Sequence, residues 1–148
     1  MDEEHSLSVV VKNLSNHFQR YTATIKKKIS AKAKTKKITE SQGRIIHFLY
    51  SRLHEDVYQK DIEKEFNIRR STATVILQLM EKNGLITREV SASDGRLKKI
   101  ILTKRAKDTY PIAHVEIVNA EKQAEKGISK KDMETFIRVA KQIAKNIS

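Results

Sequence analysis

Residues 58–102, YQKDIEKEFNIRRSTATVILQLMEKNGLITREVSASDGRLKKIIL, hold the pattern that decides the fold. Apolar residues recur here first at helical spacing and then at every second position. Ile62 and Phe66 lie four residues apart and therefore point to the same side of a helix. We expect that helix to span residues 58–66 and to be followed by a short break at residues 67–70.

The next segment is typical of an amphipathic helix over residues 71–83. Its apolar side recurs at three- and four-residue spacing, as expected for a face turned towards a core, and comprises Ala73, Ile76, Leu77 and Met80. Gly84 suits the left-handed backbone conformation that ends many helices. The outward side of this helix would carry Ser71, Thr72, Val75, Gln78, Leu79 and Lys82.

From residue 85 to residue 103 the period changes to two, which is typical of strands. Ile86, Arg88 and Val90 alternate with their neighbours, and residues 91–95 (SASDG) have the composition of a turn. The residues that follow supply a return strand. The sequence thus predicts a two-stranded hairpin whose basic side chains are Arg88, Arg96, Lys98 and Lys99.

Another helix precedes these elements. Thr39 and Gln42 form a capping box, in which each side chain satisfies a free backbone amide at the start of a helix. The apolar face that follows contains Ile45, Ile46, Leu49, Tyr50 and Leu53. Val57 could form a short strand before the next helix. Three short helices followed by a hairpin describe a winged helix-turn-helix.

Both ends of the chain carry seams of apolar residues at alternating four- and three-residue spacing. The seams lie in residues 6–29, 103–126 and 129–147. This spacing is typical of helices that pack lengthwise on other helices. These seams could pack against each other within one chain or against the seams of a second copy.

Composition narrows the class of protein. The 148 residues carry a formal net charge of +12, which indicates a polyanionic partner such as nucleic acid or an acidic membrane surface. The chain has no cysteine, which excludes disulfides and thiolate metal sites. The first residues are acidic, and no apolar run is long enough to span a bilayer. We therefore expect neither a signal peptide nor a membrane span, and we place the protein in the cytoplasm.

A lysine-rich stretch covers residues 20–37, where eight lysines and arginines occur without an acidic residue. Two interpretations stay open. The stretch can be a solvated helix end and loop, or it can be a patch that faces phosphates.

Several short motifs, in order along the chain, resemble the multiple-antibiotic-resistance regulator (MarR) family. They are Ile38-Thr39, residues 62–68 (IEKEFNI), residues 71–74 (STAT), residues 80–86 (MEKNGLI), residues 93–96 (SDGR) and Leu102-Thr103. Asp94-Gly95-Arg96 looks like the Asp-x-Arg wing signature of that family. The chain departs from the family at residues 103–106, which lack the frequent acidic-glycine pattern.

The resemblance implies a dimer in which the first, fifth and sixth helices of two chains interlock, and this would explain the seams at both chain ends. Residues 1–37 and 104–148 would then form a helical dimerisation region, and residues 38–103 the winged helix-turn-helix. The implied fold class is mainly α with a small β-hairpin wing. Two recognition helices, each over residues 71–83, would address a pseudo-palindromic operator in double-stranded DNA.

The resemblance also implies the DNA contacts. Polar residues of the recognition helix read bases, the arginines before it bind phosphates, and in the wing Asp94 braces Arg96 for the minor groove. Val75 and Leu79 lie where the family often has polar or basic residues, and they could contact thymine methyl groups or pack. The expected DNA-binding residues are Arg69, Arg70, Ser71, Thr72, Thr74, Gln78, Lys82, Arg88, Asp94, Arg96, Lys98 and Lys99.

Members of the family often bind small, frequently anionic aromatic effectors between the dimerisation helices and the winged region. The resemblance implies that His17, Tyr21 and Tyr110 could line such a crevice. Alternatively, they could be core aromatics of a helical seam. No two histidines have the four-residue spacing of a metal site on a helix, so we expect no metal and no bound cofactor.

Neither a phosphate-binding loop nor a nucleophile motif occurs, so we expect no enzyme. The leading interpretation is a homodimeric, sequence-specific transcription regulator, a repressor relieved by a small-molecule effector. The alternative is a basic architectural or non-specific nucleic-acid-binding module without effector response, which the lysines of residues 26–37 would favour. RNA binding has less support because no exposed aromatic cluster is visible.

Overall fold

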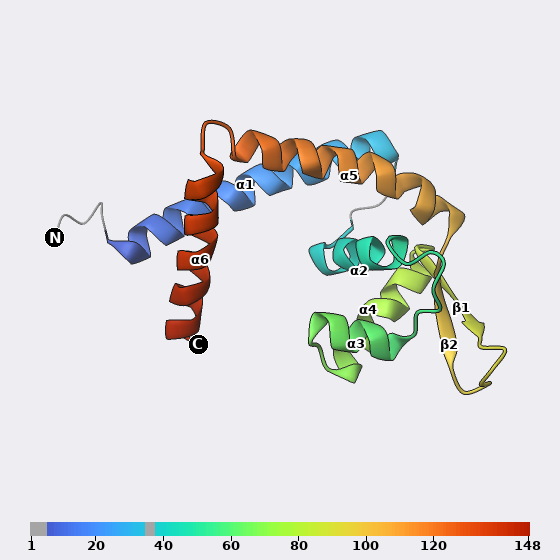
Figure 1. The fold of residues 1–148 in the computed structure, drawn as a ribbon. Coiled ribbons are helices and arrows are strands. Elements are labelled where there is room, and N and C mark those ends of the chain that lie inside the picture. The colour runs from blue at the N-terminus through green and yellow to red at the C-terminus, as the bar shows by residue number, and fades with distance from the viewer. Residues whose placement is uncertain (1–5, 35–37) are drawn as a thin grey trace.

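The structure is a computed structural model that describes residues 6–34 and 38–148. Residues 1–5 and 35–37, and with them Lys36 and Lys37 of the lysine-rich stretch, lie outside the described residues. Helices dominate the fold and a single hairpin projects from it (Figure 1), which confirms the predicted fold class. In chain order the elements are α1 (Leu7–Ala33), α2 (Glu40–Tyr50), α3 (Gln59–Phe66), α4 (Arg70–Lys82), β1 (Ile86–Val90), β2 (Lys98–Leu102), α5 (Lys104–Ala124) and α6 (Lys130–Asn146).

Helices α2, α3 and α4 pack with the hairpin around one hydrophobic core. Ile62, Leu77 and Met80 are fully buried in it, and burial of such a side chain stabilises the fold by roughly 1.5–3 kcal/mol. Leu77 and Met80 lie on the apolar side predicted for α4, whereas Ile76 is only partly buried at the edge of the core. Helix α2 ends before Leu53, which is exposed.

Strands β1 and β2 are antiparallel, and Ile86 pairs with Leu102 at the base of the hairpin. A further segment joins the hairpin at its side, because the Ile100 amide donates to the Val57 carbonyl at 2.8 Å. In place of the short strand expected at Val57, the chain forms an isolated bridge between Tyr58 and Lys99. This bridge ties the chain before α3 to the return strand of the hairpin.

Local sequence signals determine where the helices begin and end. The Thr39 hydroxyl accepts from the Gln42 amide while the Gln42 side chain accepts from the Thr39 amide, which confirms the capping box of α2. Thr103 caps α5 directly after β2, since its hydroxyl accepts from the Ala106 amide and donates to the Gly84 carbonyl at 2.8 Å. Gly84 ends α4 with a φ of +68°, in the left-handed region where other residues are strained. The end of α4, the hairpin and the start of α5 are thus tied together.

The long helices α1 and α5 lie side by side, above the winged region in Figure 1. Helix α1 runs to Ala33, beyond its expected end at Ile29. The Tyr21 hydroxyl of α1 donates to the Ala120 carbonyl of α5 at 3.1 Å. The first and fifth helices, which flank the winged region in the sequence, are therefore in contact within one copy of the protein.

A buried carboxylate joins these two helices. Glu116 of α5 is only 4% exposed, and it forms ion pairs with Lys32 and, at 2.7 Å, with Lys28 of α1. Hydrogen bonds from Lys28 and Lys32 hold the pKa of Glu116 below its usual range. Two members of the lysine-rich stretch thus neutralise an acid of the same chain. This contact has no local signal in the sequence, because Lys32 and Glu116 are 84 residues apart.

Replacing Glu116 by glutamine should remove a pH-dependent part of the stability. Because the folded-state pKa is lowered, the carboxylate stabilises the fold above the ordinary glutamate pKa of about 4.3, and this contribution is lost as the pH falls through the folded-state value. We expect Glu116→Gln to lower the midpoint of thermal unfolding near neutral pH, and the gap to the parent chain to narrow as the pH is lowered below about 4.3. Glu121→Gln, on the exposed surface of α5, is the control and should show no such gap. A gap for Glu116→Gln that does not narrow would contradict the ion-pair assignment.

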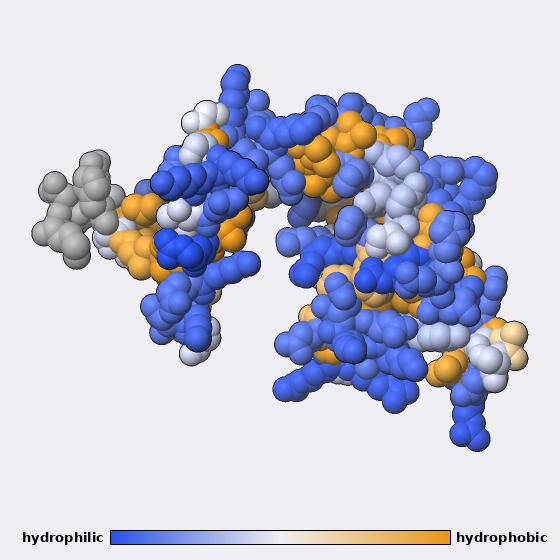
Figure 2. Space-filling view, in the orientation of Figure 1, coloured by the Kyte–Doolittle hydropathy of each residue, from blue (hydrophilic) through white to orange (hydrophobic). Residues whose placement is uncertain are grey.

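Large apolar side chains remain uncovered on the outer helices. Phe18 of α1 is 51% exposed and Phe136 of α6 is 53% exposed. Figure 2 shows apolar surface gathered on the part of α1 near the N-terminus. The predicted seam residues exposed in this way include Leu7, Val11, Leu14, Ile137 and Ile147. Contiguous apolar surface of this kind is typical of regions that pair with another molecule.

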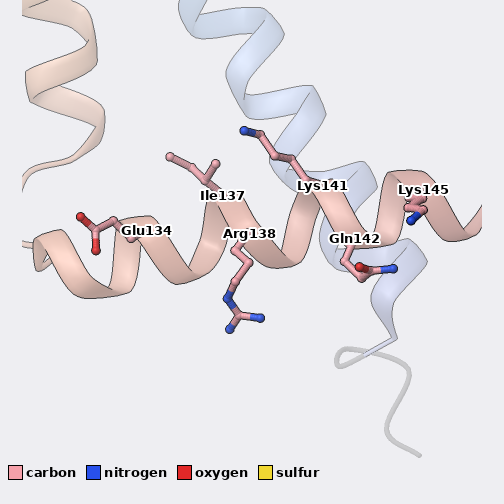
Figure 3. A pocket seen from close by; sticks show the side chains of 6 residues that line it. All are labelled: Glu134, Ile137, Arg138, Lys141, Gln142 and Lys145. Atoms are coloured by element: carbon pink, nitrogen blue, oxygen red, sulfur yellow. The ribbon is translucent and has the colours of Figure 1, made fainter.

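A shallow hollow runs along α6 (Figure 3). The side chains that line it all come from α6 itself and are Glu134, Ile137, Arg138, Lys141, Gln142 and Lys145. Figure 3 shows them pointing in different directions rather than converging on one point. The hollow therefore lacks the convergent polar groups that are typical of a ligand site.

Candidate nucleic-acid interface

The turn between α3 and α4 is built around Asn67, whose φ of +48° lies in the left-handed region that asparagine tolerates better than most residues. The Gln59 side-chain amide donates to the Glu63 carboxylate within α3 and, across the turn, to the Thr74 hydroxyl of α4 at 2.9 Å. The Thr74 hydroxyl donates in turn to the Arg70 carbonyl at 2.8 Å. These bonds fix α4 against α3 and so fix the direction in which the first turn of α4 points.

The outward face of α4 and the residue before it bring together half of the predicted DNA-binding residues. The exposed ones are Arg69, Arg70, Ser71, Thr72, Gln78 and Lys82. Thr74, also a predicted DNA-binding residue, is half-buried, and its hydroxyl is bonded to Gln59 and to the Arg70 carbonyl. The position of Thr74 makes it a brace between α3 and α4 rather than a residue presented to a partner.

Asp94 holds the tip of the wing. Its carboxylate accepts from the Arg96 backbone amide at 2.9 Å, and its carbonyl accepts from the Leu97 amide at 3.0 Å. The Ser91 amide closes the turn by donating to the Leu97 carbonyl at 2.8 Å. Asp94 therefore braces the wing through the backbone of Arg96, and the Arg96 and Lys98 side chains stay exposed.

Two basic residues of the hairpin that are predicted to contact DNA form ion pairs within the chain. The Nε atom of Arg88 lies 3.4 Å from the Glu81 carboxylate of α4, and only 19% of the Arg88 side chain is exposed. Lys99 pairs with Asp56 at 2.5 Å, and this hydrogen bond raises the pKa of the Lys99 amine above its ordinary value. Arg88 and Lys99 thus anchor the hairpin to the rest of the winged region.

The first turn of α4 and the wing lie at one end of the molecule, and α1 and α5 lie at the other (Figure 1). Lys28 and Lys32, which are bound to Glu116, therefore lie away from the candidate interface. Within the described residues, this part of the lysine-rich stretch is not continuous with the basic face of α4 and the wing. This arrangement favours the interpretation of these lysines as part of a helix surface.

The three residues predicted to line an effector crevice do not come together within one chain. His17 is exposed, and its Nδ1 atom lies 2.8 Å from the Asn13 carbonyl. Tyr21 reaches Ala120 of α5. Tyr110 lies ten residues earlier on that helix, about 15 Å away along its axis.

Tyr110 belongs instead to a cluster between α2 and α5. Its hydroxyl lies 2.5 Å from Nδ1 of His47 and 3.3 Å from Nδ1 of His114. Its ring stacks on Tyr50, with ring centroids 4.1 Å apart, and the rings of His47 and His114 stack at 6.2 Å. Burial raises the pKa of the Tyr110 hydroxyl and Tyr50 adds to the rise. The hydroxyl therefore keeps its proton and can donate to one of the two imidazoles.

The sequence only partly indicates this cluster, in which His47 and His114 stack. The four-residue spacing of Tyr110 and His114 is a local signal for part of it. The rest has no local signal, because His47 and Tyr110 are 63 residues apart. In the part of the chain that the structure describes, no three histidine or acidic groups lie close enough together to hold a metal ion.

A braced wing beside an exposed, basic helix face defines a winged helix-turn-helix protein. A family model described as MarR family matches residues 37–97. The transcription regulator MarR from Oenococcus oeni PSU-1 is 31% identical in sequence, with a TM-score of 0.67 over 95% of this chain and 99% of that chain. The chain belongs to the MarR family of transcription regulators.

Two further solved structures share the fold. The haem sensor PefR from Streptococcus agalactiae, in complex with haem, is 25% identical over 98% of this chain and 93% of that chain, with a TM-score of 0.71. The MepR–DNA complex of Staphylococcus aureus contains a chain that is 22% identical over 99% of this chain and all of that chain, with a TM-score of 0.72.

Membership of this family agrees with the expectation that the chain is not an enzyme, because the family consists of DNA-binding transcription regulators. Among the helices that the structure describes, none is long and apolar enough to cross a membrane.

Proposed function

We propose that the protein is a homodimeric, sequence-specific transcription regulator that acts in the cytoplasm as a repressor, and that a small molecule releases it from DNA. The proposal depends on the exposed face of α4, which carries Arg69, Arg70, Ser71, Thr72 and Gln78. Hydroxyl and amide groups can read base edges in the major groove, and the arginines can bind phosphates. The wing, which carries the exposed Arg96, lies at the same end of the molecule (Figure 1), so Arg96 can reach the minor groove.

A second copy of the chain would cover the exposed apolar residues of α1 and α6, such as Phe18 and Ile137. Two copies present two α4 helices, so the operator should be a pseudo-palindrome with half-sites about one helical turn apart, roughly 10 base pairs. MepR, which has the same fold, has been solved in complex with DNA.

Selection of genomic DNA fragments by the purified protein tests this proposal. We expect an enriched pseudo-palindrome that binds about a thousandfold more tightly than a scrambled sequence of the same composition. The affinity should fall steeply with salt, because the basic residues displace counterions from phosphates. Equal affinity for both DNAs at physiological salt would overturn sequence-specific regulation in favour of a non-specific basic module. A solution mass of one subunit at working concentrations would overturn the dimer.

The cluster of His47, Tyr50, Tyr110 and His114 supports a response to a small molecule. It lies between α2 of the winged region and α5. A ligand at this position can bind two orientations of the winged region with different affinities, and a population shift requires such a difference. Imidazole and phenol groups can ligate haem iron, and they can form hydrogen bonds to an aromatic carboxylate.

Haem and salicylate are therefore the two probes to add to the protein–operator complex. We expect one of them to weaken DNA binding by the parent chain and to have little effect on His114→Ala. His54→Ala, an exposed histidine after α2, is the control and should respond like the parent chain. An unchanged DNA affinity with both probes would remove the support for this cluster as the effector site and leave the DNA-binding proposal intact.

A further inference from the structure

Two large apolar side chains stand uncovered in the middle of the recognition helix. Val75 is 56% exposed and Leu79 is 47% exposed, whereas Leu77 and Met80 of the same helix are fully buried. Residues four apart lie on one face of a helix, so Val75 and Leu79 form a single apolar stripe. Both residues therefore lie outside the core of the winged region, and packing within the chain does not account for them.

Polar and basic residues surround the stripe. Ser71 and Thr72 lie one turn before Val75, and Gln78 and Lys82 lie one turn after Val75 and Leu79. All four are exposed, and helix neighbours at this spacing share a face. The apolar stripe thus runs along the centre of the face that, under the proposed function, enters the major groove.

The chemistry of the major groove offers one apolar group to such a stripe. Each base pair presents hydrogen-bond donors and acceptors there, but only thymine adds a methyl group, at C5. A second protein chain is a poorer partner for this face, because the arginines at its start, Arg69 and Arg70, and the lysine at its end match phosphates. The same basic frame would repel an identical copy.

We propose that Val75 and Leu79 recognise thymine methyl groups, so that the operator is specified by thymines under the middle of α4. This inference rests on the proposed function. Ser71, Thr72 and Gln78 supply hydrogen bonds around these positions. The stripe distinguishes thymine from the other bases without a hydrogen bond. Cytosine, which lacks the methyl group and presents an amino donor, is disfavoured under the stripe.

Replacing thymine by deoxyuridine, one position at a time, in the selected operator tests this inference. Deoxyuridine lacks the methyl group and keeps every hydrogen-bonding group of thymine. We expect the parent chain to bind about fourfold more weakly for each methyl group that the stripe contacts. Val75→Ala and Leu79→Ala should weaken binding to the thymine operator to a similar extent and should lose the sensitivity to deoxyuridine at the contacted position.

Gln78→Ala is the matched control, since it changes a neighbouring exposed residue of the same face. It should weaken binding to the thymine and deoxyuridine operators by the same factor. A selected operator whose affinity is insensitive to deoxyuridine at every position, or Val75→Ala and Leu79→Ala chains as sensitive as the parent, would overturn the inference alone. Failure to select any operator would overturn the proposed function together with it. Loss of dimerisation in Val75→Ala or Leu79→Ala would show instead that the stripe binds a second copy.

Discussion

Leu77→Ala should lower the free energy of unfolding by about 2–5 kcal/mol. Leu77 is fully buried where α4 packs on α2, α3 and β1. Its truncation removes apolar contacts and leaves a cavity that the surrounding helices cannot fill completely. A domain of this size is stable by only about 5–15 kcal/mol, so the change should be plain in urea or thermal unfolding followed by circular dichroism. The variant should also lose operator binding at temperatures at which the parent chain is still folded.

Val75→Ala is the control for this stability prediction. Val75 lies two residues earlier on the same helix and is exposed, so its truncation should change the free energy of unfolding by less than about 0.5 kcal/mol. If Leu77→Ala is as stable as the parent chain, α4 does not dock on the core as described.

Arg96→Ala should weaken operator binding by about 1–3 kcal/mol, which corresponds to roughly 5- to 150-fold in affinity. The Arg96 side chain is exposed at the tip of the wing, and Asp94 binds only its backbone amide. Alanine keeps that amide, so the wing should keep its shape and the variant should unfold at the same temperature as the parent. Fluorescence anisotropy with labelled operator at a fixed salt concentration measures the loss.

The control for the wing is Lys126→Ala. Lys126 is exposed in the turn between α5 and α6, at the end of the molecule opposite the wing. Lys126→Ala removes one positive charge, as Arg96→Ala does. The affinity of this control variant for the operator should stay within about twofold of the parent, as expected for a charge more than a Debye length away. An Arg96→Ala chain that binds like Lys126→Ala would exclude the wing from the interface.

Features that depend on neighbours in the sequence are predictable from it. The capping box of Thr39 and Gln42, the left-handed Gly84 and the buried side of α4 all follow from residues within a few positions of one another. The strand period of the hairpin is equally local. Local rules of this kind determine the elements and their order, and for that reason the fold class and the exposed face of α4 could be predicted.

Features that depend on a distant partner could not be predicted in the same way. Arg88 has the charge of a DNA contact, yet Glu81 lies across the packed hairpin and holds it. Glu116 is polar and falls near the apolar seam of α5, and only the packing of α1 brings Lys28 and Lys32 to it. In each case the sequence identifies the charged residue. Tertiary packing then determines which residue of opposite charge pairs with it.

Thr103 is the only residue between the return strand of the wing, β2, and the long helix α5. Helix α5 has 21 residues, which corresponds to a rod of about 31 Å. A tilt of the rod by only about 5° moves its far end by about 3 Å. Because only Thr103 separates α5 from β2, a displacement of α5 would also displace the base of the hairpin.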